Sequence, residues 1–315
     1  MTAYLVRRCI QAVAVVLGVT SIVFIIIHAL PGGPARGLLG PEASSLQVHE
    51  FIVQNGYNQP LIVQYGRFLG QLVQGNLGYS YHYNQNVRAL LSENLPKSAV
   101  LVGLAYLVAL VIAIPLGIMQ AVRRNSVADY VTTGASFVAY SMPTFWLGIL
   151  LILGFSISWH LLPPEAPQGA TVAAVLSHPQ AMVLPVATLA LVSIAAFSRF
   201  MRSSAIETLL QDYIRTARAM GVPERTILGR YLLRNSLIPI VTLLGLSLPA
   251  TISGAVITES VFNYPGMGLL FYTAATSHDF PVLLGSTVVI ATATVLGSLV
   301  ADVLYAVVDP RVRYS

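Results

Sequence analysis

Long apolar stretches without Asp, Glu, Lys or Arg recur along this chain, and polar segments separate them. A helix needs about 20 mostly apolar residues to cross the ~30 Å hydrocarbon core of a bilayer. Six stretches meet this requirement, and the last carries Asp302 near its end. They are residues 9–30, 98–121, a span within 130–159, about 181–198, 236–258 and 281–308. The pattern predicts an all-α, polytopic membrane protein with six transmembrane helices.

Composition supports the same fold class. Of the 315 residues 56% are hydrophobic and 9% are charged, whereas soluble domains carry roughly 25% charged residues. This balance argues against a soluble enzyme, a nucleic-acid binder or a secreted disulfide scaffold. The first stretch follows Arg7 and Arg8, as in a signal peptide, but it exceeds the apolar region of about 7–15 residues that such peptides have. We therefore expect a retained span. The single cysteine, Cys9, excludes an intramolecular disulfide.

Basic residues predict the orientation, because cytoplasmic loops of membrane proteins are rich in Lys and Arg. Most of the 17 basic residues fall in segments that six spans place on one side. These residues are Arg7, Arg8, Arg123, Arg124, Arg199, Arg202, Arg215, Arg218, Arg225, Arg230, Arg234, Arg311 and Arg313. The short segments 160–180 and 259–280 contain none. Both termini are therefore expected in the cytoplasm.

The segment 31–97 is too long for a simple connection and predicts an extracytoplasmic helical subdomain. It begins with a helix stop at residues 31–34 (PGGP). Apolar residues at helical spacing predict a helix that ends near Gly75. These residues are Ile62, Tyr65, Leu69, Leu72 and Val73. The subdomain is either a passive cap or a docking surface for a soluble partner. We divide the chain into 1–30 (N-terminal segment and span 1), 31–97, and a core of 98–315.

The segment 199–235 predicts two helices that project between the fourth and fifth spans. An apolar stripe runs along the first helix, and polar residues fill much of its other face. The stripe comprises Met201, Ala205, Ile206, Leu209, Tyr213, Ile214, Ala217 and Met220. Gly221 and Pro223 follow in the order expected for a helix end and a helix start. Such a segment either lies on anionic lipid headgroups or is gripped by another protein, and amphipathicity does not separate the two.

Candidate catalytic chemistry is missing from the sequence. It contains no G-x-x-x-x-G-K-[ST] loop for ATP phosphates, no H-E-x-x-H and no G-x-S-x-G. The six histidines are isolated in sequence. The span centres lack ionisable residues, which argues against an ion-coupled carrier built from this chain alone. We expect neither enzymatic activity nor a cofactor or metal site.

Several motifs, in order and spacing, resemble the transmembrane permease subunit of a bacterial ABC importer, B-type of the dipeptide/oligopeptide (and nickel) group. The resemblance covers nearly the whole chain. The motifs are Arg7-Arg8 with 30–32 (LPG), 75–80 (GNLGYS), 141–148 (SMPTFWLG), 213–221 (YIRTARAMG), 259–268 (ESVFNYPGMG) and 309–311 (DPR). The segment 259–268 is the strongest single match. The resemblance implies a type I ABC-importer permease fold.

The resemblance also implies roles for particular residues. The coupling helix that contacts the ATPase would comprise Tyr213, Ile214, Arg215, Thr216, Ala217, Arg218, Ala219, Met220 and Gly221. Candidates for the pathway or its gate are Ser141, Met142, Pro143, Glu259, Phe262, Tyr264, Pro265 and Gly266. The general permease motif begins Glu-Ala-Ala, whereas this chain has Arg215-Thr216-Ala217 there. The helix as a whole, and no single acidic residue, is therefore the expected contact.

The implied partners are a homologous second permease subunit, two ATPase domains that bind ATP, an extracytoplasmic substrate-binding protein, a peptide substrate and membrane lipid, with no nucleic acid. The expected location is the bacterial plasma (inner) membrane. Within the family, nickel, haem or glutathione remain alternative substrates. Outside it, the alternative is a stand-alone carrier or channel, which would act without ATP or partner subunits.

Overall fold

The computed structural model describes residues 2–29, 35, 39, 43–80, 82–253 and 255–308. The helix stop at 31–34, the motif at 30–32, the closing motif at 309–311, and Arg311 and Arg313 lie outside these residues. The first half contains α1 (Thr2–Ala29), α3 (Ser45–Gln54), α4 (Leu61–Val73), β1 (Tyr79–Ser80), β2 (Gln85–Asn86), α5 (Val87–Val122), α6 (Val127–Ser141), α7 (Thr144–Leu151) and the π-helical η1 (Ile152–Ser158). The second half contains α8 (Val172–Leu176), α9 (Pro179–Leu209), α10 (Asp212–Ala219), α11 (Glu224–Thr226), the π-helical η2 (Ile227–Leu232), α12 (Leu233–Ser236), α13 (Ile238–Ser253), α14 (Val256–Val261), α15 (Met267–Thr276) and α16 (Phe280–Val308).

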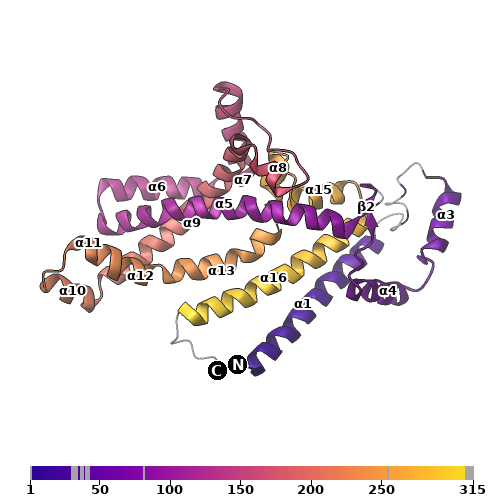
Figure 1. Cartoon of the computed structure of the whole chain (residues 1–315), viewed down its shortest axis with the longest axis horizontal. Helices are drawn as coiled ribbons and strands as arrows, with labels where there is room; N and C mark the ends of the chain where they lie inside the picture. The colour runs from indigo at the N-terminus through magenta and orange to yellow at the C-terminus, as the bar shows by residue number, and fades with distance from the viewer. Residues whose placement is uncertain are drawn as a thin grey trace.

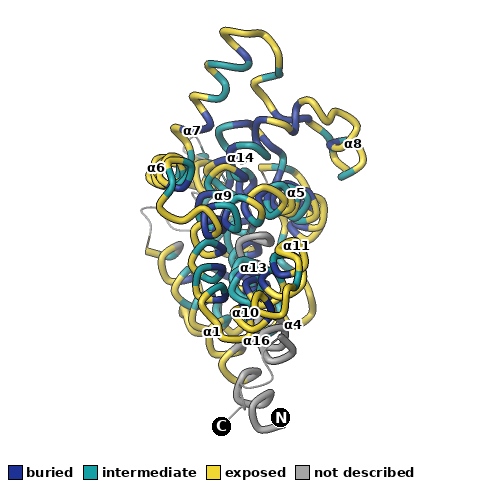
Figure 2. Tube along the Cα trace, turned by 90° about the vertical axis from the view of Figure 1, so that its left-hand side faces the viewer, coloured by how far each residue is buried: buried dark blue, intermediate teal, exposed yellow. Residues whose placement is uncertain are grey.

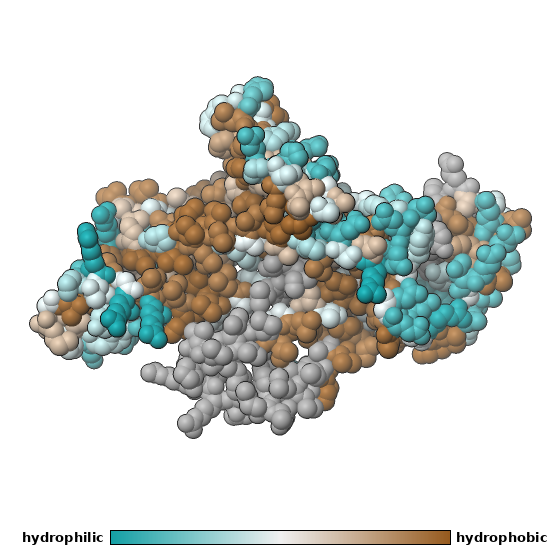
Figure 3. Space-filling model, viewed as in Figure 1, coloured by the Kyte–Doolittle hydropathy of each residue, from teal (hydrophilic) through white to brown (hydrophobic). Residues whose placement is uncertain are grey.

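The long helices α1, α5, α9, α13 and α16 run along the long axis of the molecule (Figure 1). The short helices α10 and α11 lie at one end, and α3, α4 and the hairpin β1–β2 lie at the other. Brown apolar surface occupies the middle of this axis in Figure 3, and teal polar residues gather towards both ends. An apolar belt between two polar ends is the surface that a bilayer requires of a polytopic protein.

The six predicted spans correspond to helices in the structure. Within the described ranges, four helices are long and apolar enough to cross a membrane, and the bent pair α6 with α7–η1 makes a fifth. α1 is a helix of 28 residues whose described apolar part is Val13–Ile26. α5 begins at Val87, before the predicted start at Ser98, and carries Pro96 and the buried Lys97 inside the helix.

The third predicted span, within residues 130–159, is bent in the structure. α6 and α7–η1 meet at an angle of 105°. Pro143 cannot continue a helix and pushes the preceding residue out of the α region, so Met142 has an extended backbone (φ −74°, ψ 131°). α7 and η1 therefore project from the bundle (Figure 2), and most of their residues are exposed or only partly buried.

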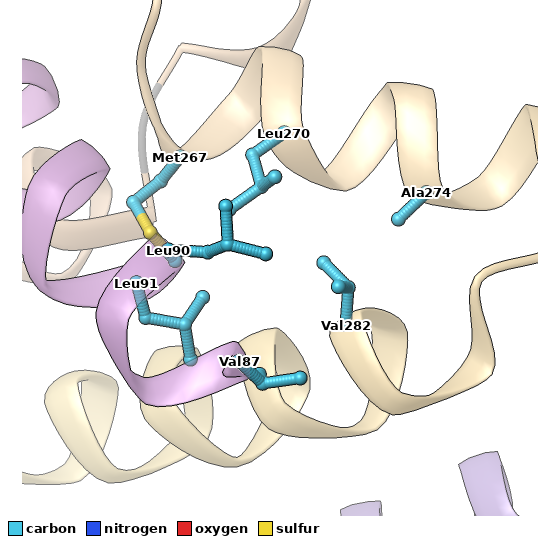
Figure 4. Packing of buried hydrophobic residues seen from close by; sticks show 7 residues of the cluster. All are labelled: Val87, Leu90, Leu91, Met267, Leu270, Ala274 and Val282. Atoms are coloured by element: carbon cyan, nitrogen blue, oxygen red, sulfur yellow. The ribbon is translucent and has the colours of Figure 1, made fainter. Parts of the chain in front are cut away.

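Buried side chains form a row of clusters along the bundle. α5 and α9 pack closely, because Gly117 leaves room for Met201, whose Cβ would lie 2.6 Å from a Cβ at position 117. A second cluster joins the start of α5 to α15 and α16 (Figure 4). It contains Val87, Leu90, Leu91, Met267, Leu270, Ala274 and Val282. Close packing of these side chains joins the ends of the three helices.

The segment 43–80 packs mainly on α1 through aromatic and polar contacts. The Tyr65 hydroxyl of α4 lies 2.7 Å from the Ser21 hydroxyl of α1, and His28 Nε2 lies 3.0 Å from Gln64 Oε1. The ring of Phe24 stands edge-on to Tyr65 at 5.2 Å between centroids. α4 begins and ends where the periodicity predicts, because Gly75 adopts a positive φ of 75° that helices cannot continue.

Candidate functional site

Two junctions between helices contain most of the predicted site residues. We call residues 210–236, which follow α9 and include α10, α11, η2 and α12, the arginine elbow. We call the contacts of Ser98 and Glu259 with the backbone of residues 255 and 267–269 the glutamate clamp. The elbow lies at the end of the molecule opposite α3 and α4 (Figure 1).

The arginine elbow starts where α9 ends. The predicted apolar stripe is divided here, because α9 ends at Leu209 and α10 starts at Asp212. The predicted single helix through Met220 is therefore wrong. Gln211 has an extended backbone (φ −70°, ψ 146°), which breaks the helical hydrogen-bond ladder and turns α10 away from the axis of α9. The periodicity continues across the break, so the sequence pattern alone does not reveal it.

The inner side of α10 is buried against η2. Ile214 and Ile227 are fully buried, Ala217 is 3% exposed, and Val222 packs on them. Asn235 Nδ2 donates to the Tyr213 hydroxyl at 3.1 Å. These contacts give the short helix α10 a fixed place on the elbow, which an isolated helix of 8 residues would lack.

A hydrogen bond between two buried hydroxyls joins the elbow to α9. The Ser236 hydroxyl of α12 donates to the Thr208 hydroxyl at 3.1 Å, and both residues are buried. α12 leads through Leu237 directly into α13. The elbow is therefore anchored at both ends on long helices of the bundle.

The turn after α10 depends on Gly221, as the sequence predicts. Gly221 has φ +76°, a conformation that L side chains rarely adopt, and no neighbour lies within 4 Å of a Cβ built there. Arg218 and Glu224 bridge the turn, with Nη2 to Oε1 at 2.7 Å and both side chains about half exposed. The hydrogen bond from Arg218 to Glu224 raises the pKa of this guanidinium above its ordinary value.

The outer side of α10 is exposed. Met220 is 72% exposed and Tyr213 is 42% exposed, although both belong to the predicted apolar stripe. Arg215 is paired only loosely with Asp212, at 3.5 Å between two exposed side chains. Thr216 and Ala219 complete this exposed face. The elbow therefore presents apolar and basic groups outward, a composition that fits contact with another macromolecule.

The glutamate clamp joins α5, α14 and α15. Glu259 of α14 is fully buried. Its Oε1 accepts from the Ser98 hydroxyl at 2.7 Å and from Ala255 N at 3.1 Å. Its Oε2 accepts from Gly268 N at 2.7 Å and Leu269 N at 3.1 Å. The carboxylate thus satisfies free N–H groups at the start of α15, where a negative charge is favoured.

Ser98 completes this arrangement and was not among the predicted site residues. Its hydroxyl donates to Glu259 and accepts from Met267 N at 2.7 Å. Gly268 allows the close approach, because a Cβ there would lie 2.5 Å from Val256 Cα. The sequence gives no periodic signal for such a contact, since Ser98 and Glu259 are far apart along the chain.

Phe262 and Tyr264 are also fully buried, next to the clamp. The Tyr264 hydroxyl donates to the Lys97 carbonyl at 2.6 Å. Pro265 and Gly266 form the turn before α15. The aromatic pair therefore forms part of the packed interior of this chain, and a gating role for these residues stays a prediction.

Ser141, Met142 and Pro143 lie at a different place, at the bend between α6 and α7. They line an open apolar hollow of about 610 Å³ together with Phe137, Val138, Phe145 and Trp146. The predicted gate residues thus form two groups. α7 connects them, since a Cβ at Gly148 would lie 3.2 Å from the Phe262 ring.

An ion pair between α6 and α9 was missed at the sequence level. Asp129 and Arg202 are joined by two contacts of 2.8 Å. Asp129 lies immediately before the stretch 130–159 that is expected to hold the third span, and Arg202 belongs to the polar face of a predicted amphipathic helix. Within the part of the chain that the structure describes, no group of three or more His, Cys, Asp or Glu could hold a metal ion.

Together, the bundle of long apolar helices, the exposed elbow at one end and the folded segment 43–80 at the other define a polytopic membrane protein of the permease class. Residues 113–314 match the sequence family of the binding-protein-dependent transport system inner membrane component. Residues 1–102 match the family of the N-terminal part of such membrane components. The chain therefore belongs to this family of transport-system membrane components. It is a multi-pass permease subunit of a bacterial transport system and not an enzyme.

Full-length relatives agree with this assignment. The oligopeptide transport system permease protein AppB of Bacillus subtilis (strain 168) is 38% identical over 316 residues and covers 100% of both chains. The probable D,D-dipeptide transport system permease protein DdpB of Escherichia coli (strain K12) is 40% identical, over 97% of this chain and 96% of its own. The dipeptide transport system permease protein DppB of Alkalihalophilus pseudofirmus is 33% identical over 100% of both.

A solved structure supports the fold. The MetNI methionine ABC transporter in inward-facing conformations matches with a TM-score of 0.53 and 17% identity, over 70% of this chain and 96% of the matched chain. The fold is therefore that of an ABC-transporter permease, as the sequence predicts.

Proposed function

We propose that this chain is the transmembrane permease subunit of an ATP-driven importer for dipeptides or oligopeptides. The relatives named for peptide transport, which match along the full chain at 33–40% identity, support the substrate class. The observation that carries the mechanism is the arginine elbow, an exposed helix fixed on a buried base between α9 and α13.

The elbow would receive motion from an ATPase. The sequence contains no loop that would hold ATP phosphates, so the energy for transport comes from another subunit. α10 offers Met220 and Tyr213 as apolar contacts and Arg215 as a partner for acidic groups. Because the buried base links α10 to α9 and, through α12, to α13, a force on α10 would be passed to both long helices rather than absorbed in a loose loop.

The proposed assembly contains this chain, a homologous second permease subunit, two ATPase domains and an extracytoplasmic substrate-binding protein. Both termini and the elbow would lie in the cytoplasm. The basic residues support this orientation, because Arg215, Arg218, Arg225, Arg230 and Arg234 all lie on the elbow and basic loops remain on the cytoplasmic side. The pathway would run between the two permease subunits, with the two groups of predicted gate residues as candidates for its lining.

The test is affinity purification of the assembled importer from membranes with Met220 variants. Met220→Glu places a charge in the exposed apolar contact, and Met220→Leu keeps its size and polarity. An ATPase subunit is expected to co-purify with the wild type and Met220→Leu, and to be lost from Met220→Glu while the permease itself remains folded. Equal recovery of the ATPase from all three would refute the coupling role.

Reconstitution separates the proposed importer from a stand-alone carrier or channel. Liposomes that contain the complete assembly should take up a labelled dipeptide only under two conditions. ATP must be present in the lumen, on the side of the ATPase, and the binding protein must be present outside. Uptake by this chain alone, without ATP, would establish the carrier instead. Competition by nickel, haem or glutathione, in place of peptides, would assign the substrate to one of those alternatives.

A further inference from the structure

The ion pair between Asp129 and Arg202 joins the start of α6 to α9. Arg202 Nε and Nη2 each contact one oxygen of the Asp129 carboxylate at 2.8 Å. The Asp129 side chain is 2% exposed and the Arg202 side chain is 28% exposed. Asn125 N and the Thr133 hydroxyl also donate to the carboxylate, at 3.1 and 3.2 Å. Both oxygens are thus fully engaged, and the pair has one preferred geometry.

The contact lies near the end of α9 that leads into the arginine elbow. α9 is a continuous helix of 31 residues, and Arg202 lies two helical turns, or about 10 Å, before its last residue. Asp129 lies in the first turn of α6, which leads to the bend at Met142 and Pro143. The ion pair therefore connects the base of the elbow to the start of the bent span.

Beyond the ion pair, α6 and α9 also meet where the Arg199 guanidinium lies over the Tyr140 ring, at 5.0 Å from its centroid. A cavity of about 240 Å³ lies between them, lined on one side by Thr133, Ser136 and Tyr140 and on the other by Ser198 and Arg199. The hydroxyls of Ser136 and Ser198 approach to only 3.5 Å. Much of the rest of α6 is exposed. The cavity interrupts the packing between the two helices, whereas the two-pronged ion pair fixes their relative position and would make α6 follow a shift of α9.

We propose that Asp129 and Arg202 are positioning residues that make α6, and with it the bent span α6–α7–η1, move together with α9 when the elbow is displaced. The proposal rests on the proposed function of α10 as the helix that receives motion. A buried ion pair adds little net stability over an apolar pair, because desolvation offsets much of the attraction. Its particular property here is a fixed relative orientation of two helices, which is what transmission of motion requires.

The test compares ATP use with transport in the complete importer, reconstituted in liposomes with its binding protein. Asp129→Asn and Arg202→Gln should leave ATPase recovery and ATP hydrolysis near wild-type levels and lower dipeptide uptake per ATP by at least about tenfold. Glu207→Gln removes an exposed charge from the same helix and should leave this ratio unchanged. An unchanged uptake-to-ATP ratio in the two pair variants overturns the proposal.

A disulfide tests whether the link itself is what matters. Ser136→Cys and Ser198→Cys, introduced into Asp129→Asn with Cys9→Ser, place two thiols where hydroxyls already lie 3.5 Å apart. Oxidation should restore uptake per ATP, and reduction should abolish it again. Failure of the oxidised protein to recover, or loss of the whole complex in Asp129→Asn under both conditions, shows a purely structural pair and overturns the proposal. If the ATPase does not bind the wild-type permease through the elbow, the proposed function itself is refuted instead.

Discussion

The glutamate clamp and the arginine elbow are both short connections between helices, but they use their polar groups in opposite ways. In the clamp, Glu259 is fully buried, and Ser98 and three backbone N–H groups donate to its two oxygens. In the elbow, Arg215 of α10 and Met220, which directly follows α10, are exposed. A connection whose bonding groups are all satisfied within the chain is built to stay fixed. One that leaves a face exposed is built to be contacted.

This difference predicts different consequences of mutation. Changes in the clamp remove interactions that the folded chain makes with itself, so they should lower its stability. Changes on the outer face of the elbow remove nothing from the fold and should act on assembly instead.

Glu259→Ala should have the largest effect. It removes the acceptor of four hydrogen bonds and leaves buried donors unsatisfied, at a cost of roughly 3–5 kcal/mol. The measurement is the thermal midpoint of the detergent-solubilised protein, determined from the loss of its monodisperse size-exclusion peak on heating. Glu165→Ala, at an exposed position, is the control and should match the wild type. Equal thermal midpoints for the two variants would show that the glutamate clamp does not stabilise the fold.

Gly268→Ala should have the next largest effect. Its Cβ would lie 2.5 Å from Val256 Cα, a backbone atom that cannot move aside without shifting α14. Overpacking of this kind costs about 1–3 kcal/mol. Gly103→Ala on α5 has no neighbour within 4 Å and should be neutral or stabilising. A Gly268→Ala protein as stable as Gly103→Ala would show that the close approach of α14 and α15 is not required.

Gly221→Ala should loosen the elbow without a steric clash. The left-handed backbone at φ +76° costs an L residue roughly 1–2 kcal/mol. Hydrogen exchange should accelerate at the amides of α10, which the turn holds against Ile227, while the clamp amides stay protected. Gly229→Ala, in η2 and free of neighbours, is the matched control. Unchanged exchange in α10 would mean that the turn does not hold the helix in place.

Arg215→Ala should have the smallest effect on stability. Its ion pair with Asp212 spans 3.5 Å between side chains that are 69% and 97% exposed, and such pairs contribute about 0–1 kcal/mol. The thermal midpoint should therefore not change, but retention of the ATPase on an affinity column should fall at moderate salt. A lower thermal midpoint with full retention of the ATPase would show that Arg215 stabilises the fold and does not contact the ATPase.

The features that the sequence predicts here are those with a local or periodic signal. The spans follow from uninterrupted apolar runs, α4 from the spacing of Ile62, Tyr65 and Leu69, and the turn after α10 from Gly221. Each depends on neighbouring residues alone. The motifs at 213–221 and 259–268 indicate both junctions, because they resemble segments of a known family, whereas composition and periodicity do not point to these places.

The features that the sequence does not reveal depend on tertiary contacts. Pro143 signals a break but not an angle of 105°. The apolar stripe continues past Leu209 without marking the end of α9, because a helix break keeps the spacing of the residues on either side. Ser98 meets Glu259, and Asp129 meets Arg202, only through the packing of α5, α9 and the segments between them. Single-sequence patterns carry no signal for such pairs.

Cross-linking from the exposed side of the arginine elbow in intact membranes would show directly whether an ATPase contacts it. A photoreactive residue in place of Met220, which is 72% exposed, lies at the centre of the proposed contact. We expect one main protein adduct, with the mass of the permease plus the ATPase subunit, under conditions in which the importer transports peptide. Adducts with lipid alone from an actively transporting complex would contradict it.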